Sequence, residues 1–559
     1  MDYTKYKPQP TIDFPQRTWP NKKITKAPKW CSVDLRDGNQ SLEIPMTLEQ
    51  KLDFFSFLVD IGFKEIEVGF PAASDTEFQF LRTLIEKKLI PNDVIIQVLT
   101  PSRDALIRRT FEALSDVPKG IVHLYNATSP LHRDVVFQKS QAETTELAVS
   151  GAELINELAT EYGRDRFIFE YSPECFSQTE PDYAIKVCNA VIDCWKGHPT
   201  IINLPFTVET AMPNAHADIV EYVIERLNDR ENIVVSLHAH NDRGTAVAAT
   251  ELCLLAGADR VEGTLFGNGE RTGNADLITL AMNLYAQGID PCLDFSNIDR
   301  AIDVYTKYTD LPVHPRHPYA GELVYTAFSG SHQDAIRKGM ARMSQDQTNE
   351  KGQLWSMPYL PIDPKDVGRS YDPIIRINSQ SGAAASAFIL ESNYGILIPK
   401  PIQRNFGLVV TAVSDSRGTD LSPKDIHELF KTTYVNKDTP AKLITWNETQ
   451  VKDQVQDQEK SEIIHVSGEI MWKESTVKIN GQGDGIIEAF CHGFMEVTGI
   501  HFDIKHYSQH ALESGREARA ITYVGIAVDE KEISYGVGIS RNITTSSLKA
   551  VISAFNNKV

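Results

Sequence analysis

The sequence predicts an α/β protein in which a (β/α)8 TIM barrel is followed by linker subdomains and a C-terminal α+β domain of two βββα units. Eight short β-branched runs recur roughly every 30 residues between Trp30 and Phe266, and helical patterns lie between them. The dinucleotide fingerprint is missing after the first run, which disfavours a doubly wound open sheet, the alternative. Near residue 440 the pattern changes to three strands and a helix, repeated once.

The eight predicted barrel strands are rich in β-branched residues and are bounded by turn-forming residues. They are Trp30–Leu35, Glu65–Phe70, Val94–Thr100, Ile121–Asn126, Arg166–Tyr171, Thr200–Pro205, Ile233–His240 and Arg260–Phe266.

The helix after the first strand carries clear boundary signals. Thr47 and Gln50 form a T-x-x-Q capping box, and Gly62 ends the helix. Ser74 and Glu77 repeat the capping signal before the second helix. The apolar face of the first helix is predicted to consist of Leu48, Leu52, Phe55 and Val59.

These patterns divide the chain into an N-terminal arm (1–30), the barrel (31–308), linker subdomains (309–440) and the C-terminal domain (441–559). The linker is placed where the alternation lapses, in a stretch rich in Pro, His and Gly.

The C-terminal domain contains an internal repeat. Strands are predicted at 442–451, 462–472, 476–480, 502–508, 519–528 and 535–540, with helices at Gly485–Thr498 and Thr544–Phe555. Two such units of about 58 residues are typical of a pseudo-symmetric domain that binds a small molecule or forms a dimer. A dimerisation module without a ligand is the alternative.

Composition and charge bound the function. Hydrophobic residues make up 42% and charged residues 23%, the balance of a globular protein. The formal charge of −19 argues against a nucleic acid or an anionic membrane as partner.

The seven cysteines form no C-x-x-C pair, so neither a disulfide framework nor a zinc ribbon is expected. Since no run reaches roughly 18 apolar residues and the N-terminus has no apolar signal region, a cytoplasmic protein is expected.

Two histidines lie two residues apart at the end of the seventh predicted strand. Because alternate residues of a strand share a face, His238 and His240 both point into the barrel, near its catalytic end. Barrel closure leaves one strand between them and Asp37, which follows the first strand. The loop at 267–274 offers a further oxygen ligand. This mixed set suits Mg²⁺ or Mn²⁺, with Zn²⁺ as a further option; a core histidine without a ligand is the alternative.

The runs LRDGNQ, SLHAHND and GNGERTGN together resemble the pyruvate-carboxyltransferase-type condensing enzymes, and within them the 2-isopropylmalate synthase family. HLYNATS, NLPFTVE, AFSGSHQDA and PYLPIDPKDVGR resemble the long, leucine-regulated form. The resemblance implies a metal-dependent condensation of acetyl-CoA with 3-methyl-2-oxobutanoate that gives 2-isopropylmalate and CoA. Homocitrate or citramalate synthase, a barrel-type acyl-CoA lyase and a non-catalytic amino-acid sensor are the alternatives.

The resemblance also implies roles for single residues. Arg36 would polarise the oxo group, with an internal salt bridge to Asp34 or Asp37 as the structural alternative. Thr207 would contact the substrate carboxylate, and His123 is expected beside the substrate. The implied metal ligands are Asp37, His238, His240 and Asn274.

Condensation requires a base that removes a proton from the acetyl methyl group. Glu174 after the fifth strand, His123, and His332 with Tyr359 from the linker form the candidate group, and the sequence does not single out one of them. The resemblance implies that His332 and Tyr359 reach the active site of the partner subunit in a homodimer. His314 and His317 are left out of the site because they lie in the linker.

In the C-terminal domain a glycine-rich segment opens the first helix, where exposed N–H groups suit an amino-acid carboxylate. The resemblance implies a leucine effector site, and Glu488 departs from the small apolar residue common in the family, which bears on the strength of feedback. Turn glycines without a ligand are the alternative. The implied lining residues are Gly483, Gly485, Ile487, Ala518 and Ala520.

Overall fold

A computed structural model describes residues 5, 11–327, 329–345, 354–371, 383–417, 421–451, 463–512, 518–528 and 532–559. The chain forms two compact units. The first comprises Met1–Val324 and Ile362–Ser370, and the second comprises Tyr325–Pro361 and Tyr371–Val559. Within the described residues no helix is both long and apolar enough to cross a membrane.

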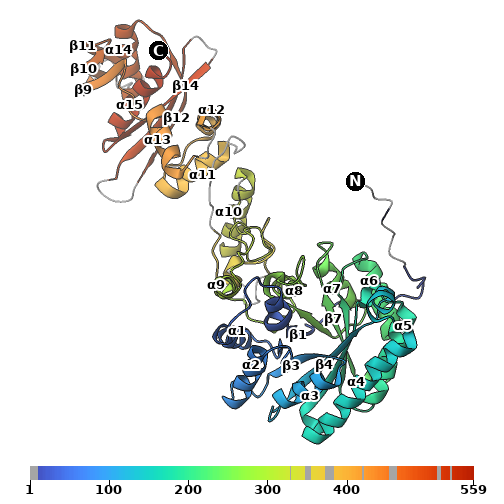
Figure 1. The fold of residues 1–559 in the computed structure, drawn as a ribbon. Helices are drawn as coiled ribbons and strands as arrows, with labels where there is room; N and C mark the ends of the chain where they lie inside the picture. Colours follow the sequence, from blue (N-terminus) through green and yellow to red (C-terminus); the bar gives the residue numbers. More distant parts are fainter. Residues whose placement is uncertain are drawn as a thin grey trace. The chain divides into compact units, whose positions relative to one another are not determined.

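The first unit contains a closed barrel of eight parallel strands in sequential order, surrounded by helices (Figure 1). The first strand pairs with the last, which confirms the barrel and excludes the open sheet. The strands are β1 (Lys29–Ser32), β2 (Glu65–Gly69), β3 (Ile95–Pro101), β4 (Gly120–Ala127), β5 (Phe167–Glu174), β6 (Thr200–Phe206), β7 (Ile233–Ala239) and β8 (Arg260–Gly263).

The helices alternate with these strands, as the sequence predicts. They are α1 (Leu48–Asp60), α2 (Asp75–Glu86), α3 (Asp104–Ala113), α4 (Gln141–Tyr162), α5 (Pro181–Cys194), α6 (Pro213–Ile224), α7 (Ala246–Leu255), α8 (Leu277–Tyr285) and α9 (Ile298–Thr309).

The first and last strands end earlier than predicted. β1 ends at Ser32 because the chain turns at once into a π-helical segment, Asp34–Gly38. β8 ends at Gly263, and a short 3-10 turn, Leu265–Gly267, follows it. Both early endings leave irregular backbone at the carboxyl ends of neighbouring strands, where barrel enzymes carry their active sites.

The predicted buried face of α1 is wrong by about one position along the helix. Lys51, Phe54, Phe55 and Leu58 are buried, whereas Leu52 and Val59 are only half-buried. A fully buried lysine is tolerated because Lys51 pairs with Glu77 of α2. The capping box of Thr47 and Gln50 is confirmed. At the second helix the Ser74 side chain caps as predicted, but the Glu77 carboxylate binds Lys51.

The segment before the barrel packs against α6. The indole nitrogen of Trp19 donates to Asp218 at 2.8 Å, and the backbone N–H of Thr18 donates to Glu221 at 2.8 Å. Arg17 forms an ion pair with Asp218 at 2.7 Å. The described part of the predicted arm is therefore fixed to the barrel by buried carboxylates.

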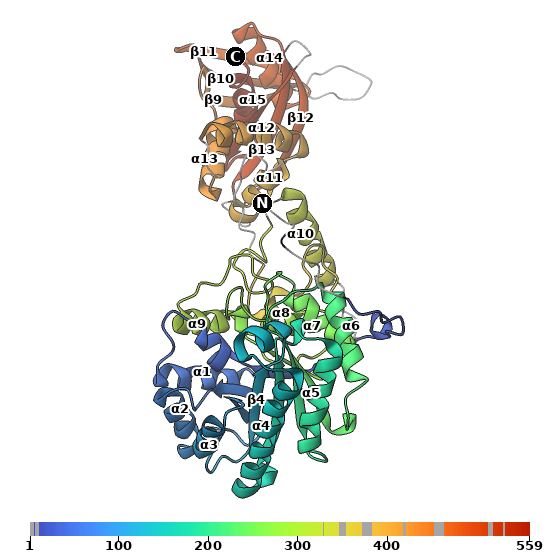
Figure 2. The ribbon, with the colours of Figure 1, turned by 45° about the vertical axis from the view of Figure 1, so that its right-hand side comes forward.

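The second unit carries the C-terminal repeat, which can be followed in Figure 2. Its sheets have the orders β11-β10-β9 and β12-β13-β14. Helix α14 packs on the first sheet, and α15 packs on the second and on β9. The two βββα units are thus confirmed. The elements are β9 (Ala441–Val451), β10 (Ile463–Trp472), β11 (Ser475–Gly483), α14 (Ile486–Thr498), β12 (Asp503–Ala511), β13 (Ala520–Val528), β14 (Glu532–Ser540) and α15 (Ile543–Asn556).

Four further helices precede this repeat. They are α10 (Gly330–Gln345), α11 (Ala383–Tyr394), α12 (Lys400–Arg417) and α13 (Pro423–Tyr434). Apolar residues of α11, α12 and α13 form one core with Ile521, Tyr523 and Val537 of the second sheet. The region predicted as linker subdomains is therefore largely helical from Gly330 onward among the described residues.

Candidate metal centre and substrate cavity

Three side chains converge at the carboxyl end of the barrel strands. Asp37 comes from the turn after β1, His238 from the end of β7, and His240 from just beyond it. The Nε2 atoms of His238 and His240 lie 3.7 Å and 3.8 Å from the Oδ2 atom of Asp37. One ligand atom from each residue lies within 4.8 Å of the others, and all three residues are buried. This arrangement can hold a metal ion.

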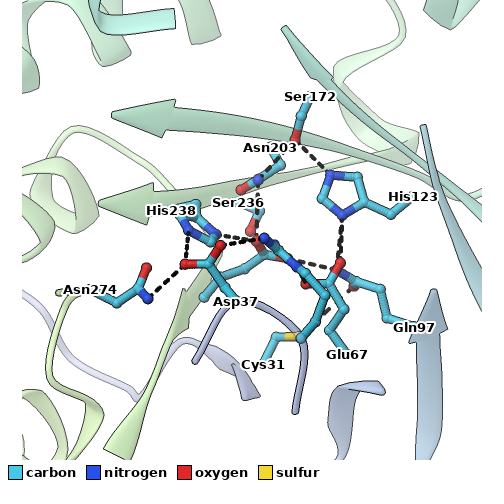
Figure 3. A network of polar contacts seen from close by, with 12 residues as sticks. Cys31, Asp37, Glu67, Gln97, His123, Ser172, Asn203, Ser236, His238 and Asn274 are labelled. Atoms are coloured by element: carbon cyan, nitrogen blue, oxygen red, sulfur yellow. Dashed lines mark hydrogen bonds and ion pairs between the residues drawn. The ribbon is translucent and has the colours of Figure 1, made fainter. Parts of the chain in front are cut away.

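Asn274 lies at the same point, as Figure 3 shows. Its Nδ2 atom donates to the Asp37 carboxylate and to the Asn268 carbonyl, both at 2.8 Å. Its Oδ1 atom is buried and has no hydrogen-bond partner within the described residues. Because a buried polar oxygen without a partner is costly, this atom fits the role of a further ligand. The predicted set of Asp37, His238, His240 and Asn274 is therefore brought together.

Electrostatics differ among these groups. Burial alone raises the pKa of Asp37, but Arg36 and the two histidines hold it well below its usual range. Burial lowers the pKa of His238, but Asp37 and Glu262 outweigh this and raise it to about 9. For His240, burial and the neighbouring His238 lower the pKa to about 4. Asp37 is therefore ionised, and its negative charge stabilises a positive charge placed beside it.

Arg36 contacts the centre directly. Its Nη1 atom lies 2.5 Å from the Asp37 carboxylate, and its Nε atom donates to Glu67. Asp34, the other predicted salt-bridge partner, instead accepts from the backbone N–H of Leu265 at 3.0 Å. Burial raises the pKa of Asp34 to about 7, so this side chain is not an ionic partner of comparable strength. The two carboxylates fix the guanidinium at the mouth of the barrel.

His123 lies in a chain of hydrogen bonds inside the barrel (Figure 3). Its Nδ1 atom is 2.9 Å from Glu67, and its Nε2 atom is 2.7 Å from the hydroxyl of Ser172. Asn203 donates to the same hydroxyl at 3.0 Å. Burial opposes ionisation of Glu67, but Arg36 lowers its pKa, so Glu67 can accept a hydrogen bond from Nδ1, and Nε2 shares a hydrogen bond with the Ser172 hydroxyl. The chain fixes the orientation of both side chains.

Inside the barrel, the buried side chains next to this chain of hydrogen bonds are charged. TIM barrels usually carry branched apolar side chains at such positions. Arg260 and Glu262 of β8 are fully buried and contact each other at 2.8 Å. Arg260 also pairs with Glu65 of β2 and Glu170 of β5. None of these residues was predicted to form a buried charge network; the spacing of two between Arg260 and Glu262, as in R-x-E, is the signal that was available.

The centre opens into a cavity of about 300 Å³. Seven predicted site residues line it, namely Arg36, Asp37, His123, Glu174, Thr207, His238 and His240. Eight further residues that line it were not predicted as site residues, namely Gln40, Leu99, Tyr125, Ser172, Asn203, Pro205, Glu270 and Arg271. Five of them lie within strands β3 to β6 and three lie in the loops after β1 and β8, and their inward direction becomes known only once the barrel is closed.

Glu174 and Thr207 face this cavity from neighbouring strands. Burial raises the pKa of Glu174, although His132 and Arg36 oppose the shift. The Oγ1 atom of Thr207 accepts from the backbone N–H of Cys175 at 2.9 Å, so its own proton can be donated to a ligand. Both residues can therefore contact a molecule in the cavity.

His332 and Tyr359 belong to the second unit and lie next to each other there. Their rings stack with centroids 3.9 Å apart, and both side chains are exposed. The positive φ of 64° at Tyr359 presents its side chain in an uncommon backbone conformation.

The C-terminal repeat contains a second cavity, of about 750 Å³, at the N-terminal ends of α14 and α15. Of the five predicted effector residues, Gly485 and Ile487 line it. Gly483 instead lies where β11 meets α14, and a Cβ atom there would lie 2.8 Å from the Ala489 nitrogen. The last two predicted residues, Ala518 and Ala520, lie before and at the start of β13 and do not line this cavity.

Comparison with known proteins identifies the class first. Residues 27–304, which include the barrel, match the HMGL-like family. Residues 322–391 match the alpha-isopropylmalate synthase post-catalytic domain-like family, and 420–559 match the LeuA allosteric (dimerisation) domain.

Full-length relatives narrow the identification. The chain is 55% identical to a 2-isopropylmalate synthase of Acetoanaerobium sticklandii, with 100% of this chain and 97% of that protein covered. It is 48% identical to the enzyme of that name from Clostridium acetobutylicum, with 100% and 99% covered, and 49% identical to that of Pseudomonas entomophila, with 99% and 97% covered. The chain belongs to the 2-isopropylmalate synthase family.

Proposed function

We propose that this enzyme condenses acetyl-CoA with 3-methyl-2-oxobutanoate and water to give 2-isopropylmalate and CoA, the first committed step towards leucine. The observation that carries the proposal is the convergence of Asp37, His238 and His240 beside Arg36 in one cavity. Similarity over the full length to enzymes of this name supports the substrate assignment.

The proposed metal ligands are Asp37, His238, His240 and Asn274. Their mixed oxygen and nitrogen atoms suit Mg²⁺, with Mn²⁺ or Zn²⁺ as further options. A bound divalent cation would polarise the ketone and stabilise the negative charge that develops on its oxygen.

Arg36 would supply a second positive charge at the oxo group. Its guanidinium is held by Asp37 and Glu67, so it needs no reorientation when charge develops. Thr207 would donate its hydroxyl proton to the substrate carboxylate, and His123 would contact the substrate from the barrel interior.

The proposed base belongs to the group Glu174, His123, His332 and Tyr359. Burial raises the pKa of Glu174, which makes this carboxylate a stronger base than an ordinary glutamate. His332 and Tyr359 lie together, so either can orient the other at an active site. In the proposed homodimer they would act at the partner subunit's cavity.

The test is incubation of the purified protein with acetyl-CoA, Mg²⁺ and a panel of 2-oxo acids, with thiol release as the readout. The expected result is the highest kcat/KM with 3-methyl-2-oxobutanoate and loss of activity after chelation, restored by the metal. Preference for pyruvate or 2-oxoglutarate would move the assignment to citramalate or homocitrate synthase. Cleavage of an acyl-CoA without any condensation would indicate a lyase.

The C-terminal cavity is proposed as the leucine site of a cytoplasmic, feedback-regulated homodimer. Gly485 and Ile487 line it, and so does Glu488. However, Glu488 also accepts from the backbone N–H of Asp484 at 2.9 Å, an amide that an effector carboxylate would otherwise use. Leucine is therefore expected to inhibit the unaltered protein less strongly than a Glu488→Ala variant. Equal inhibition of the two proteins would contradict this role of Glu488.

A further inference from the structure

Glu262 is a fully buried carboxylate on β8 that lies directly opposite His238 of β7 in the strand register. Its Oε2 atom is 2.8 Å from the Nδ1 atom of His238. Its Oε1 atom accepts from Arg260 at 2.8 Å and from Gln97 at 2.9 Å. Asn203 donates to Oε2 at 3.2 Å. Donors from His238, Arg260, Gln97 and Asn203 thus contact the carboxylate, and the buried carboxyl group of Glu170 lies near it.

These contacts determine the tautomer of His238. A guanidinium is always protonated, so the charge of Arg260 keeps Glu262 as an acceptor. The Nδ1 atom of His238 must then carry the proton that it shares with Glu262. Its Nε2 atom, which faces Asp37 at 3.7 Å, is the nitrogen that would give up its proton and coordinate a metal.

The second histidine has no such support. The Nδ1 atom of His240 is buried and has no hydrogen-bond partner among the residues that the structure describes. Of the two imidazole rings, only that of His238 is therefore oriented, within the described residues, by a hydrogen bond at Nδ1, which Glu262 accepts. Asn203 links Glu262 to the substrate cavity. It donates to Glu262 and, at 3.0 Å, to Ser172, and both Asn203 and Ser172 line the cavity.

We propose that Glu262 is a positioning residue that holds His238 ready to bind the metal and joins this ligand to the cavity floor through Asn203. The inference rests on the metal centre proposed above. Carboxylates that accept from the second nitrogen of a metal-bound histidine commonly contribute 10- to 100-fold in metal affinity.

A glutamine at this position cannot replace the carboxylate. Its amide carries one donor and one acceptor, whereas Arg260 and His238 both present donors. If the carbonyl faces Arg260, the NH₂ group meets the Nδ1 atom of His238 and favours the tautomer that is protonated at Nε2. If the carbonyl faces His238, the NH₂ group lies against the guanidinium. Glu262→Gln therefore disturbs the ligand in either orientation.

The experiment measures the Kd for Mn²⁺ alone, from the signal of free Mn²⁺ in electron paramagnetic resonance, at fixed pH. Glu262→Gln is expected to weaken binding roughly 10- to 100-fold. Glu262→Asp keeps the charge beside Arg260 but is one methylene shorter, so a smaller loss is expected. This second variant carries the test if the first does not fold, as judged by circular dichroism.

Glu65→Gln is the matched control. Glu65 also pairs with Arg260 inside the barrel, and in the described part of the chain it contacts none of the proposed metal ligands. Its substitution is expected to lower thermal stability but to leave the Kd for Mn²⁺ within about twofold, since it removes a partner of Arg260 and no partner of His238.

His240→Ala separates the two proposals. If the unaltered protein does not bind Mn²⁺, or if His240→Ala binds it equally well, the metal centre itself is wrong. If His240→Ala weakens binding but both folded Glu262 variants bind as the unaltered protein does, only the role of Glu262 is overturned. Weakening by both Glu262 variants, without an effect of Glu65→Gln, supports the proposal.

Discussion

The Nε2 atom of His317 lies 3.0 Å from the Oδ2 atom of Asp276, and this pair fixes the chain that leaves the barrel to the start of α8. Asp276 also caps α8 by accepting from the backbone N–H groups of Ile278 and Thr279. It lies two residues after Asn274 of the metal centre. His317 lies in the region predicted as a linker, and a buried carboxylate is nevertheless its partner.

His317→Leu is expected to destabilise the protein more at pH 6 than at pH 9. Burial lowers the pKa of His317, but Asp276 outweighs this and raises it above its usual value. The stabilisation is therefore complete below the unfolded pKa of about 6.5 and is lost as the pH rises through the higher folded value. Chemical denaturation at both pH values measures the difference, and an equal loss at each would refute the pairing.

His216 is expected to have the opposite pH dependence. Its ring stacks on Phe206 with centroids 4.1 Å apart, and burial, with Arg243 nearby, lowers its pKa to about 4. Stability is thus present above about pH 6.5 and falls as the pH approaches 4, by up to roughly 3 kcal/mol. His216→Phe keeps the stacking but does not titrate. The unaltered protein should lose more stability than this variant between pH 7 and 5.

The buried ion pair between Lys51 and Glu77 gives a further prediction. Glu77→Gln should cost about 3 kcal/mol of unfolding free energy, because it leaves the fully buried ammonium without its partner. The double variant Lys51→Met/Glu77→Leu should recover most of this loss. Asp104→Asn, which breaks the exposed pair with Arg108, is the control and should cost less than about 1 kcal/mol. Urea denaturation of the four proteins tests the expectation.

Ser172→Ala should lower kcat/KM for the 2-oxo acid about tenfold without changing the Kd for Mn²⁺. The change leaves His123 and Asn203 without their shared hydroxyl, so the cavity floor loses its fixed orientation. Ser150→Ala, on an exposed turn of α4, should have no effect. Steady-state kinetics with each substrate varied in turn checks this, and unchanged constants for Ser172→Ala would exclude a role for the hydroxyl.

His238→Ala should remain folded but bind little metal and have no condensing activity. The variant removes a proposed ligand and the partner of Glu262, while the barrel strands keep their backbone pairing. Metal content by atomic emission and thiol release in the same preparation measure both effects. Metal content equal to that of the unaltered protein would show that the ligand assignment is wrong.

The barrel and the main part of the site are readable from local patterns. Period-two alternation places His238 and His240 on one face, and the strand count places Asp37 one strand away, as observed. Arg36 at the cavity follows from its position beside Asp37. These features depend on spacing along the chain and on the closure of eight equal units, which is why they could be predicted.

By contrast, the sequence did not indicate that the barrel interior is charged or which charge pairs with which. Arg260 and Glu262 of β8 come together with Glu65 of β2 and Glu170 of β5 only when the strands close around one axis. The same holds for Lys51, whose burial depends on Glu77 from another helix.

The sequence alone therefore determined the order of elements, the two βββα units and the residue types at the barrel mouth, since these follow from periodicity and local turn signals. Tertiary structure alone decided the partners of the buried polar groups. The physical reason is that a buried charge is stable only beside a specific donor or acceptor, and that neighbour can lie two hundred residues away.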